Sequence, residues 1–364
     1  MDEGTADGPA DRADDGQRAG ADAAAAGIAA PARITDVARL AGVSTATVSR
    51  VLAEPDRVAP QTRARVQEAV ARLGYVPNPA ARTLRSQKTR MVLVVLPDLE
   101  NVFFSKILRG IEETLAAAGH GMIIADLPPG SERGPAIAGF ARRQVDGVIL
   151  LNGRTLGPEA AGVPTIGLCE AIPDAAFPQI VVDNRAAASR VVRHLAALGH
   201  RRIAHLVGPS GNVLEVEREA GYEDGLAAAG LPFDPDLVWP GDYTLEAGAR
   251  AAARLAALPR RPTAVFCSND TMAIGLVGAL AEAGLSVPED VSVAGFDDIE
   301  FAAMSRPALT TIRQPRRLLG QAAAETLLAR LAGGAPPPLR VLETELVIRA
   351  STGPPPPPDR ERGS

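Results

Sequence analysis

The segment 44–50 reads Ser-Thr-Ala-Thr-Val-Ser-Arg and places small polar side chains beside one arginine. On a helix, Val48 would share an inner face with Val51 and Leu52, which follow three and four residues later. Outward hydroxyls could bind phosphate oxygens, methyl groups could contact thymine, and an arginine could form two hydrogen bonds with guanine. These residue types therefore predict a surface that contacts nucleic acid, formed by Ser44, Thr45, Ala46, Thr47, Ser49 and Arg50.

Three short amphipathic helices between residues 33 and 75 would hold this surface in place. Thr35 is a candidate N-cap of the first helix, and Gly42 supplies the turn that follows it. Ser44 is a candidate N-cap of the second helix, while Pro60 and Gly74 are suited to begin and end the third. A helix, a tight glycine turn and a second helix form a helix-turn-helix, whose second helix enters the major groove of DNA.

Charge is distributed unevenly along the chain. The 364 residues carry a net charge of −5, which by itself argues against binding to nucleic acid. Residues 1–31 hold seven acidic residues and two arginines, whereas residues 32–90 hold eleven basic residues and four acidic ones. A basic block of +7 between acidic segments is typical of a nucleic-acid-binding module on an acidic body.

Beyond residue 90 the chain alternates apolar runs with amphipathic helical patterns. Buried parallel strands are predicted in a first group at 91–96, 122–125, 145–151, 165–168 and 180–182, and in a second group at 203–207, 263–267 and 291–294. Two such clusters indicate two doubly wound lobes. The predicted fold class is therefore an all-α helix-turn-helix headpiece joined to an α/β body of two doubly wound lobes.

Ordered motifs along the chain resemble one known family. The segment 34–52 closely resembles the headpiece of the lac-repressor (LacI/GalR) family of bacterial transcription regulators, as do 58–63 and 73–78. The resemblance continues at 97–98, 103–104, 181–184, 198–203, 268–270, 287–291, 295–298 and 309–312, and it spans about residues 33–352. It implies a DNA-binding transcriptional repressor whose body is like a periplasmic sugar-binding protein.

The resemblance also implies a hinge helix between headpiece and body. In the family, two such helices fold on DNA, enter the minor groove and insert a leucine at the central base step. By this correspondence Leu84 is the wedge, Arg85 is its polar neighbour and Asn78 begins the helix. The alternative is an ordinary linker helix whose Leu84 packs on the body.

A small-molecule effector, with a sugar as the first expectation, is implied in the cleft between the two lobes. Ligands of such folds lie outside the carboxyl ends of the strands, and a sugar needs planar hydrogen-bonding groups and a flat apolar face. The expected effector-binding residues are Phe103, Phe104, Asp183, Arg218, Tyr243, Asn269 and Asp297. Phe104 could instead belong to the core, and Asp183 could instead cap the next helix.

Departures from the usual family pattern leave the effector open. Val102 replaces a frequent proline, and Cys169-Glu170 replace a more common acidic motif. Segments 97–98, 103–104 and 263–267 are similar to a cytidine-responsive member of the family. A nucleoside is therefore the alternative to a sugar.

Two other function classes fit the sequence poorly. An enzyme is disfavoured because the chain has no Walker loop, nucleophile elbow or HExxH motif. A transport binding protein would need an export signal, which the acidic N-terminus does not resemble. We expect no cofactor and no metal, since two cysteines and four histidines supply too few ligands.

The remaining expectations concern domain limits and partners. We expect a disordered acidic tail at 1–31, the headpiece at 32–77, hinge and linker at 78–89, the effector-binding and dimerisation domain at 90–352, and a proline-rich tail at 353–364. No apolar stretch is long enough to span a membrane. These features lead us to expect a cytoplasmic homodimer that binds a palindromic double-stranded DNA operator.

Overall fold

The computed structural model describes residues 32–76, 88–151, 153–172 and 174–357. The chain divides into two compact units, Met1–Arg85 and Ser86–Ser364. This division falls inside the segment that the sequence assigns to the hinge and linker. The expected acidic tail and the hinge residues Asn78, Leu84 and Arg85 lie outside the described residues.

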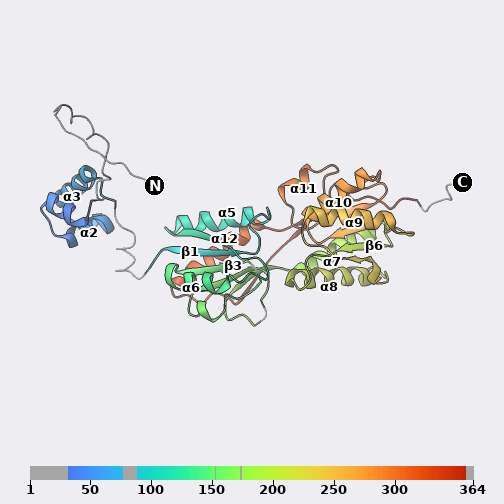
Figure 1. The fold of residues 1–364 in the computed structure, drawn as a ribbon, viewed down its shortest axis with the longest axis horizontal. Helices are drawn as coiled ribbons and strands as arrows, with labels where there is room; N and C mark the ends of the chain where they lie inside the picture. The colour runs from blue at the N-terminus through green and yellow to red at the C-terminus, as the bar shows by residue number, and fades with distance from the viewer. Residues whose placement is uncertain (1–31, 77–87, 152, 173, 358–364) are drawn as a thin grey trace, which may run out of the picture. The chain divides into compact units, whose positions relative to one another are not determined.

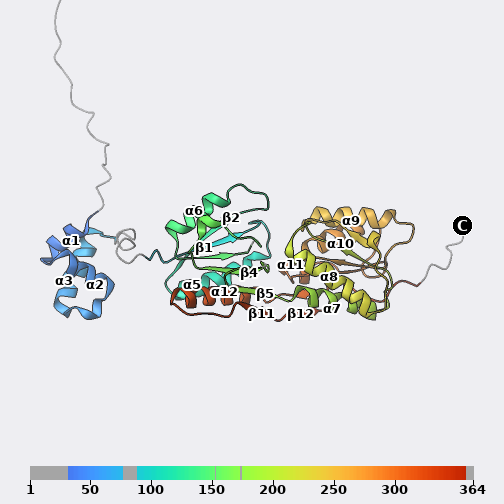
Figure 2. The ribbon, with the colours of Figure 1, turned by 90° about the horizontal axis from the view of Figure 1, so that it is seen from below.

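The first unit is the three-helix headpiece that the sequence predicts. It contains α1 (Ile34–Ala41), α2 (Thr45–Ala53) and α3 (Pro60–Leu73), with a 3₁₀ turn at Pro55–Arg57 (Figures 1 and 2). Gly42 ends α1 with a φ of 61°, a left-handed conformation that suits glycine. The small core consists of valines and alanines from all three helices, including Val37, Val48, Val51 and Val66.

The start of α1 differs from the expectation. The helix begins at Ile34 with Arg33 as its N-cap, so Thr35 lies inside the first turn and is not the cap. The Asp36 carboxylate accepts a hydrogen bond from the Arg33 backbone N–H at 3.0 Å and stabilises this start instead. Ser44 caps α2 as predicted, because its hydroxyl accepts a hydrogen bond from the backbone N–H of Thr47 at 3.1 Å.

The first lobe of the second unit is a parallel six-stranded sheet with helices on both faces. The strand order is β11-β5-β4-β3-β1-β2. The strands are β1 (Met91–Leu96), β2 (Gly121–Asp126), β3 (Gly147–Leu150), β4 (Thr165–Cys169), β5 (Gln179–Val182) and β11 (Leu339–Leu342). Helices α5 (Phe104–Ala117) and α12 (Arg316–Leu331) lie side by side on one face, and α6 (Gly134–Gln144) covers the other (Figure 2). Successive residues of β1 point to opposite faces, so Val92 and Val94 pack with α5 and α12, whereas Leu93 and Val95 pack with α6.

The second lobe repeats this arrangement on a smaller scale. Its parallel sheet has the order β7-β6-β8-β9. The strands are β6 (Ile203–Leu206), β7 (Val238–Trp239), β8 (Ala264–Cys267) and β9 (Ser292–Ala294). Helices α7 (Asn184–Ala197) and α8 (Val213–Ala228) pack on one face, and α9 (Leu245–Ala257) and α10 (Asp270–Glu282) pack on the other (Figure 1). The expectation of two doubly wound lobes is confirmed.

Three connections carry the chain between the lobes. Strand β5 leads into α7, β10 (Thr311–Arg313) leads into α12, and β11 leads into β12 (Glu345–Val347). Strands β10 and β12 pair antiparallel beside these connections. A short helix, α11 (Glu300–Met304), precedes β10 and follows the loop after β9. Each lobe is therefore built from early and late parts of the second unit.

The start of the expected proline-rich tail is bound to the second lobe. The buried ring of His200 lies 2.9 Å from the Gly353 carbonyl oxygen through Nε2. The Gly353 backbone N–H donates to Ser292 Oγ at 3.0 Å. The segment up to residue 357 is extended coil.

A search of the described helices for a membrane span finds none that is both long and apolar enough.

Candidate functional sites

The outer face of α2 carries most of the residues that the sequence assigns to nucleic-acid contact. Thr45, Ala46 and Arg50 are exposed there, while Val48 and Val51 face the core of the headpiece. Ser49 and Thr47 are half-buried. Ser44 is exposed, and its hydroxyl is 2.9 Å from that of Thr47 as well as capping the helix. The N-terminus of α2 therefore presents hydroxyls and backbone N–H groups, which suit a phosphate.

Arg50 differs from the other arginines that surround α2. Three arginines form exposed ion pairs within the headpiece, namely Arg39 with Asp36, Arg57 with Glu54 and Arg63 with Asp56. Arg65 donates to the carbonyl oxygens at the end of α1. The side chain of Arg50 is exposed and has no hydrogen-bond or ion-pair partner among the described residues of the headpiece. Within this part of the chain, its guanidinium is not engaged.

A cavity of about 680 Å³ lies between the two lobes of the second unit. The first lobe contributes residues that follow β1, β2 and β4, and the second contributes residues that follow each of its four strands. These are the carboxyl ends of parallel strands, where doubly wound folds bind ligands. Six of the seven expected residues line the cavity, namely Phe103, Phe104, Arg218, Tyr243, Asn269 and Asp297.

Asp183 is not among the cavity residues, so the structure does not support it as an effector contact. Its side chain is exposed and accepts a hydrogen bond from the backbone N–H of Ala186 at 2.8 Å. Asp183 is therefore the N-cap of α7. It follows a strand, as expected, but β5 ends at a crossover between the lobes and directs this carboxylate into the helix turn.

Arg218 and Asp297 form the polar centre of the cavity. Arg218 is only 3% exposed, and its guanidinium carbon lies 3.9 Å from the centroid of the Phe296 ring. Its Nη2 lies 3.9 Å from Asp297 Oδ1, and its Nε donates to Asn184 Oδ1 at 3.1 Å. Burial raises the pKa of Asp297 to about 6, although the charge of Arg218 opposes this effect. A hydroxyl-bearing ligand could bridge these two side chains.

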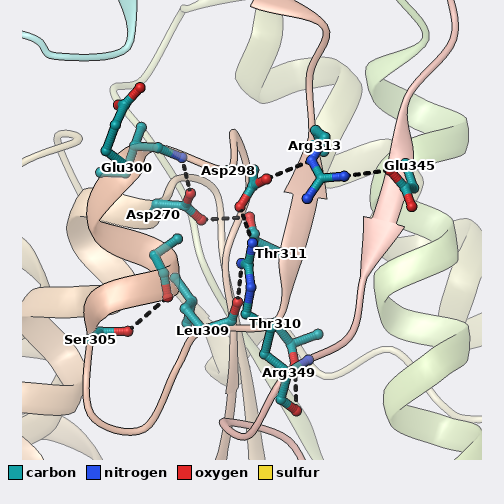
Figure 3. Close-up of polar contacts among 12 residues, drawn as sticks. Asp270, Asp298, Glu300, Ser305, Leu309, Thr310, Thr311, Arg313, Glu345 and Arg349 are labelled. Carbon is teal, nitrogen blue, oxygen red and sulfur yellow. Dashed lines mark hydrogen bonds and ion pairs between the residues drawn. The ribbon is translucent and has the colours of Figure 1, made fainter.

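The loop that carries Asp297 is held in an unusual backbone conformation. Asp297 has a φ of 120° and Asp298 has a φ of 54°, both rare for residues with a side chain. Asp298 accepts hydrogen bonds from Arg313 at 2.7 Å and from Arg349 at 2.6 Å, and Arg313 also reaches Glu345 (Figure 3). Gln314 holds Asp297 itself through a 2.8 Å hydrogen bond. Ion pairs from β10 and β12 thus fix a strained loop at the site, as functional loops often require.

The remaining expected residues combine structural and cavity-lining roles. Phe103 and Phe104 belong to the core of the first lobe and also line the cavity, with their rings edge to face at 5.2 Å. Asn269 caps α10 and donates from Nδ2 to the Tyr243 carbonyl at 3.2 Å. Phe104 therefore belongs to the core and lines the cavity as well, and its contact with an effector stays a prediction.

Three carboxyl groups at or behind the cavity were not predicted as site residues from the sequence. Asp126 ends β2 and Glu170 follows β4, and both line the cavity. Glu215 lies behind it, where it accepts hydrogen bonds from Ser268 Oγ at 2.8 Å and Tyr243 Oη at 3.3 Å. Acidic residues at the carboxyl end of a predicted strand were the available signal for Asp126 and Glu170. Glu215 offered none, because it lies inside α8.

Comparisons with known proteins agree with this architecture. A family profile described as bacterial regulatory proteins, lacI family, matches residues 33–78, and a periplasmic binding protein-like domain matches residues 192–352. Among solved structures, the lac repressor dimer bound to operator and the anti-inducer ONPF has a TM-score of 0.82 and 30% identity, covering 89% of this chain and 100% of that chain. A CelR–cellobiose complex has a TM-score of 0.67 and 34% identity, covering 88% and 99%.

Curated relatives match over most of their length. The HTH-type transcriptional repressor CytR of Escherichia coli (strain K12) is 39% identical over 334 residues, which cover 88% of this chain and 96% of CytR. The HTH-type transcriptional regulator CelR of Thermobifida fusca is 37% identical over 330 residues, which cover 86% and 96%. This chain therefore belongs to the LacI family of bacterial regulatory proteins.

Proposed function

We propose that this chain is a sequence-specific transcriptional repressor whose affinity for operator DNA is controlled by a small molecule in the cleft. The observation that carries the proposal is the pairing, in one chain, of an exposed α2 face bearing Arg50 with a polar cavity between two lobes. The first feature suits the major groove of DNA, and the second suits a small ligand. Its function is regulation and not catalysis, in keeping with its relatives.

On DNA, α2 is the recognition helix. Arg50 reaches a guanine edge, Thr45 and Ala46 meet thymine methyl groups, and the hydroxyls of Ser44, Thr47 and Ser49 lie toward the phosphates. The resemblance adds Asn78, Leu84 and Arg85 as hinge residues, with Leu84 in the minor groove. These hinge assignments concern residues outside the described part of the chain.

The repressor acts as a homodimer on a palindrome. The lac repressor to which the chain is similar was solved as a dimer on its operator. The second unit exposes several large apolar side chains beside a groove next to the cleft, including Leu245 at 48%, Phe301 at 55% and Met304 at 72% exposed. A second copy of the chain would bury such a patch. We expect this dimer to work in the bacterial cytoplasm.

The effector is a sugar or a sugar derivative. CelR was solved with cellobiose, and a LacI-family regulator from Enterococcus faecium was solved with ribose at 30% identity and a TM-score of 0.66, covering 72% of this chain and 99% of that chain. Arg218, Asn269 and Asp297 offer hydrogen bonds to hydroxyls, and the two phenylalanines offer an apolar wall. A nucleoside is the second candidate, on the resemblance of the segments 97–98, 103–104 and 263–267 to a cytidine-responsive family member.

Operator binding is tested with the purified full chain and a set of palindromic duplexes selected from random DNA. A repressor should enrich one palindrome, and the logarithm of its affinity should fall linearly with the logarithm of salt concentration. Enrichment of no sequence would contradict the proposal. A transport protein, by contrast, would bind a sugar without any effect of a duplex on that affinity.

A further inference from the structure

The cleft is strongly acidic. Six carboxyl groups line the cavity against two guanidiniums, and the carboxyl groups belong to Asp98, Glu100, Asp126, Glu170, Asp242 and Asp297. Asp242 is paired with Arg250 at 2.6 Å, whereas the other five acidic side chains have no ion-pair partner outside the cavity among the residues that the structure describes. The described lining residues include neither lysine nor histidine. A ligand that enters this cavity meets an excess of negative charge.

Both guanidiniums are already close to carboxyl groups. Arg218 faces Asp297 at 3.9 Å and interacts electrostatically with Glu170 and Glu215. Arg154 is exposed and interacts in the same way with Glu170. A phosphate or carboxylate on a ligand would therefore compete with resident acids for each guanidinium.

Asp126 is a half-buried residue, and one of its carboxylate oxygens lacks a hydrogen-bond donor. Its Oδ1 is inaccessible to solvent and accepts no hydrogen bond from any described residue. The side chain ends β2 at the wall of the cavity. Because shielded carboxylate oxygens are nearly always hydrogen-bonded, we infer that this carboxylate, whose side chain lines the cavity, turns to accept an O–H or N–H group of the ligand.

Glu170 is the second carboxyl group of the cavity wall that is suited to an O–H or N–H group of a ligand. It is 6% exposed, and the side chain of Asn212 from the opposite lobe interacts with its carboxyl group across the cleft. Burial raises the pKa of Glu170 to about 7, with Arg218 and Asn212 opposing the effect. At neutral pH this carboxyl group can therefore accept a hydrogen bond or donate one. It binds an amino or hydroxyl group better than an anion, because its ionised form repels negative charge.

We propose that the cleft selects an effector without phosphate or carboxylate, and that Asp126 and Glu170 enforce this selection by binding its hydroxyl or amino donors. The class comprises free sugars, amino sugars and nucleosides, and excludes sugar phosphates and nucleotides. The proposal rests on the proposed function, because it concerns the effector of that same cleft.

The test uses the full chain and matched pairs of ligands. Ribose, glucose, glucosamine and cytidine are each compared with ribose 5-phosphate, glucose 6-phosphate, glucosamine 6-phosphate and cytidine 5′-monophosphate by thermal shift, and binders are titrated by calorimetry. The parent compound of a binding pair should bind on the order of 100-fold more tightly than its phosphate ester. A phosphate ester that binds as tightly as its parent would overturn the inference. Binding of no compound, with operator binding intact, would contradict the proposed control by a cleft effector itself.

Variants assign the selection to residues. Asp126→Asn removes one negative charge, and Glu170→Gln removes a carboxyl group that is about half ionised at neutral pH, both at nearly constant shape. Each variant should bind the parent compound more weakly and should narrow the advantage of the parent over the phosphate ester, by about tenfold for Asp126→Asn and by less for Glu170→Gln. Glu159→Gln removes the same charge from an exposed position outside the cavity and should change neither value. Circular dichroism checks that each variant is folded, and the ligand pairs on the unmodified chain supply the test if one is not. Unchanged selectivity in both cavity variants would remove these residues from the role.

Discussion

At the scale of single residues, we propose that Arg50 reads one base pair of the operator. Arg50→Ala should cost about 1–3 kcal/mol of discrimination against the wrong base at one operator position, because a bidentate contact to guanine is lost. Competition binding with operators altered at single positions measures this loss. Arg72→Ala is the matched control, since Arg72 is an exposed residue of α3 that the recognition face does not include. A parallel loss of specificity in both variants would show that Arg50 contributes only charge.

Glu170 should make the stability of the second unit depend on pH. Its pKa is raised from 4.5 to about 7 by burial, so the folded chain keeps a proton that the unfolded chain releases. The resulting stabilisation is present below pH 4.5 and is lost as the pH rises through 7. Glu170→Gln should therefore raise the Tm at pH 8, by about 2–4 °C for each kcal/mol that the substitution adds to the free energy of unfolding. This increase in Tm should shrink toward pH 5.

The exposed Glu159→Gln serves again as the control for this pH effect. It should shift the Tm by a similar small amount at both pH values. A gain for Glu170→Gln that is equal at pH 5 and pH 8 would mean that this carboxyl group is ionised throughout, contrary to the effect of its burial.

The residues of the cleft show how far a sequence can predict a site. Strand-end positions and family motifs identified Arg218, Asn269 and Asp297, because the backbone alone brings the carboxyl ends of parallel strands together. Asp183 satisfied the same rule and failed, since β5 crosses to the other lobe at that point. Asp126 and Glu170 also lie at strand ends, which was the available signal, but the shielding of Asp126 Oδ1 and the burial of Glu170 arise only in the folded chain.

At the scale of elements, a close contact between two helices supports the phenylalanine wall of the cleft. Helices α5 and α12 touch through glycines, and a Cβ atom added at Gly320 would lie 2.1 Å from the carbonyl oxygen of Ile107. Gly320→Ala should therefore push α5 away from α12 and cost about 1–3 kcal/mol of stability. Because α5 begins at Phe104, effector affinity measured by calorimetry should fall as well.

Gly278→Ala provides the contrasting control. Gly278 is an exposed helical glycine of α10, and an added Cβ atom would meet no atom within 4 Å. Alanine there should raise stability by about 0.5–1 kcal/mol through its better helix propensity, with effector affinity unchanged. Equal stability of the two variants in denaturant titrations would mean that α5 and α12 separate without strain.

Elements were predictable where the core alone defines them. The run 91–96 could be assigned to a buried strand because every residue of it is apolar, and β1 indeed occupies these positions. Strands β11 and β12 were missed, since β11 is largely exposed at the edge of its sheet and β12 spans three partly exposed residues. These strands are determined by the crossover path of the whole body, because their few apolar residues are largely exposed or only partly buried and form no continuous apolar run.

At the scale of the whole second unit, an ion cluster beside the cleft joins the lobes. Lys106 of α5 pairs with Glu300 of α11 at 2.7 Å, and the buried guanidinium of Arg316 from α12 lies 3.4 Å from the same carboxylate. Arg316 also donates to the Asp298 carbonyl at 2.9 Å, and its guanidinium carbon lies 6.0 Å from the Phe103 ring centroid. The cluster thus connects the aromatic wall of one lobe to the strained loop of the other.

Glu300→Gln should therefore change the coupling between effector and operator more than it changes stability. Glu300 is partly exposed, so its pairs contribute only about 0–1 kcal/mol to the fold. If the free-energy difference between two arrangements of the lobes changed by a similar amount, the coupling factor would change by up to about fivefold. The coupling factor is the ratio of operator dissociation constants with and without saturating effector.

Glu112→Gln is the control, because Glu112 pairs with Arg109 inside α5, a helix of the first lobe. An equal change in both variants, or none in Glu300→Gln, would show that effector control reaches the DNA by contacts other than this cluster.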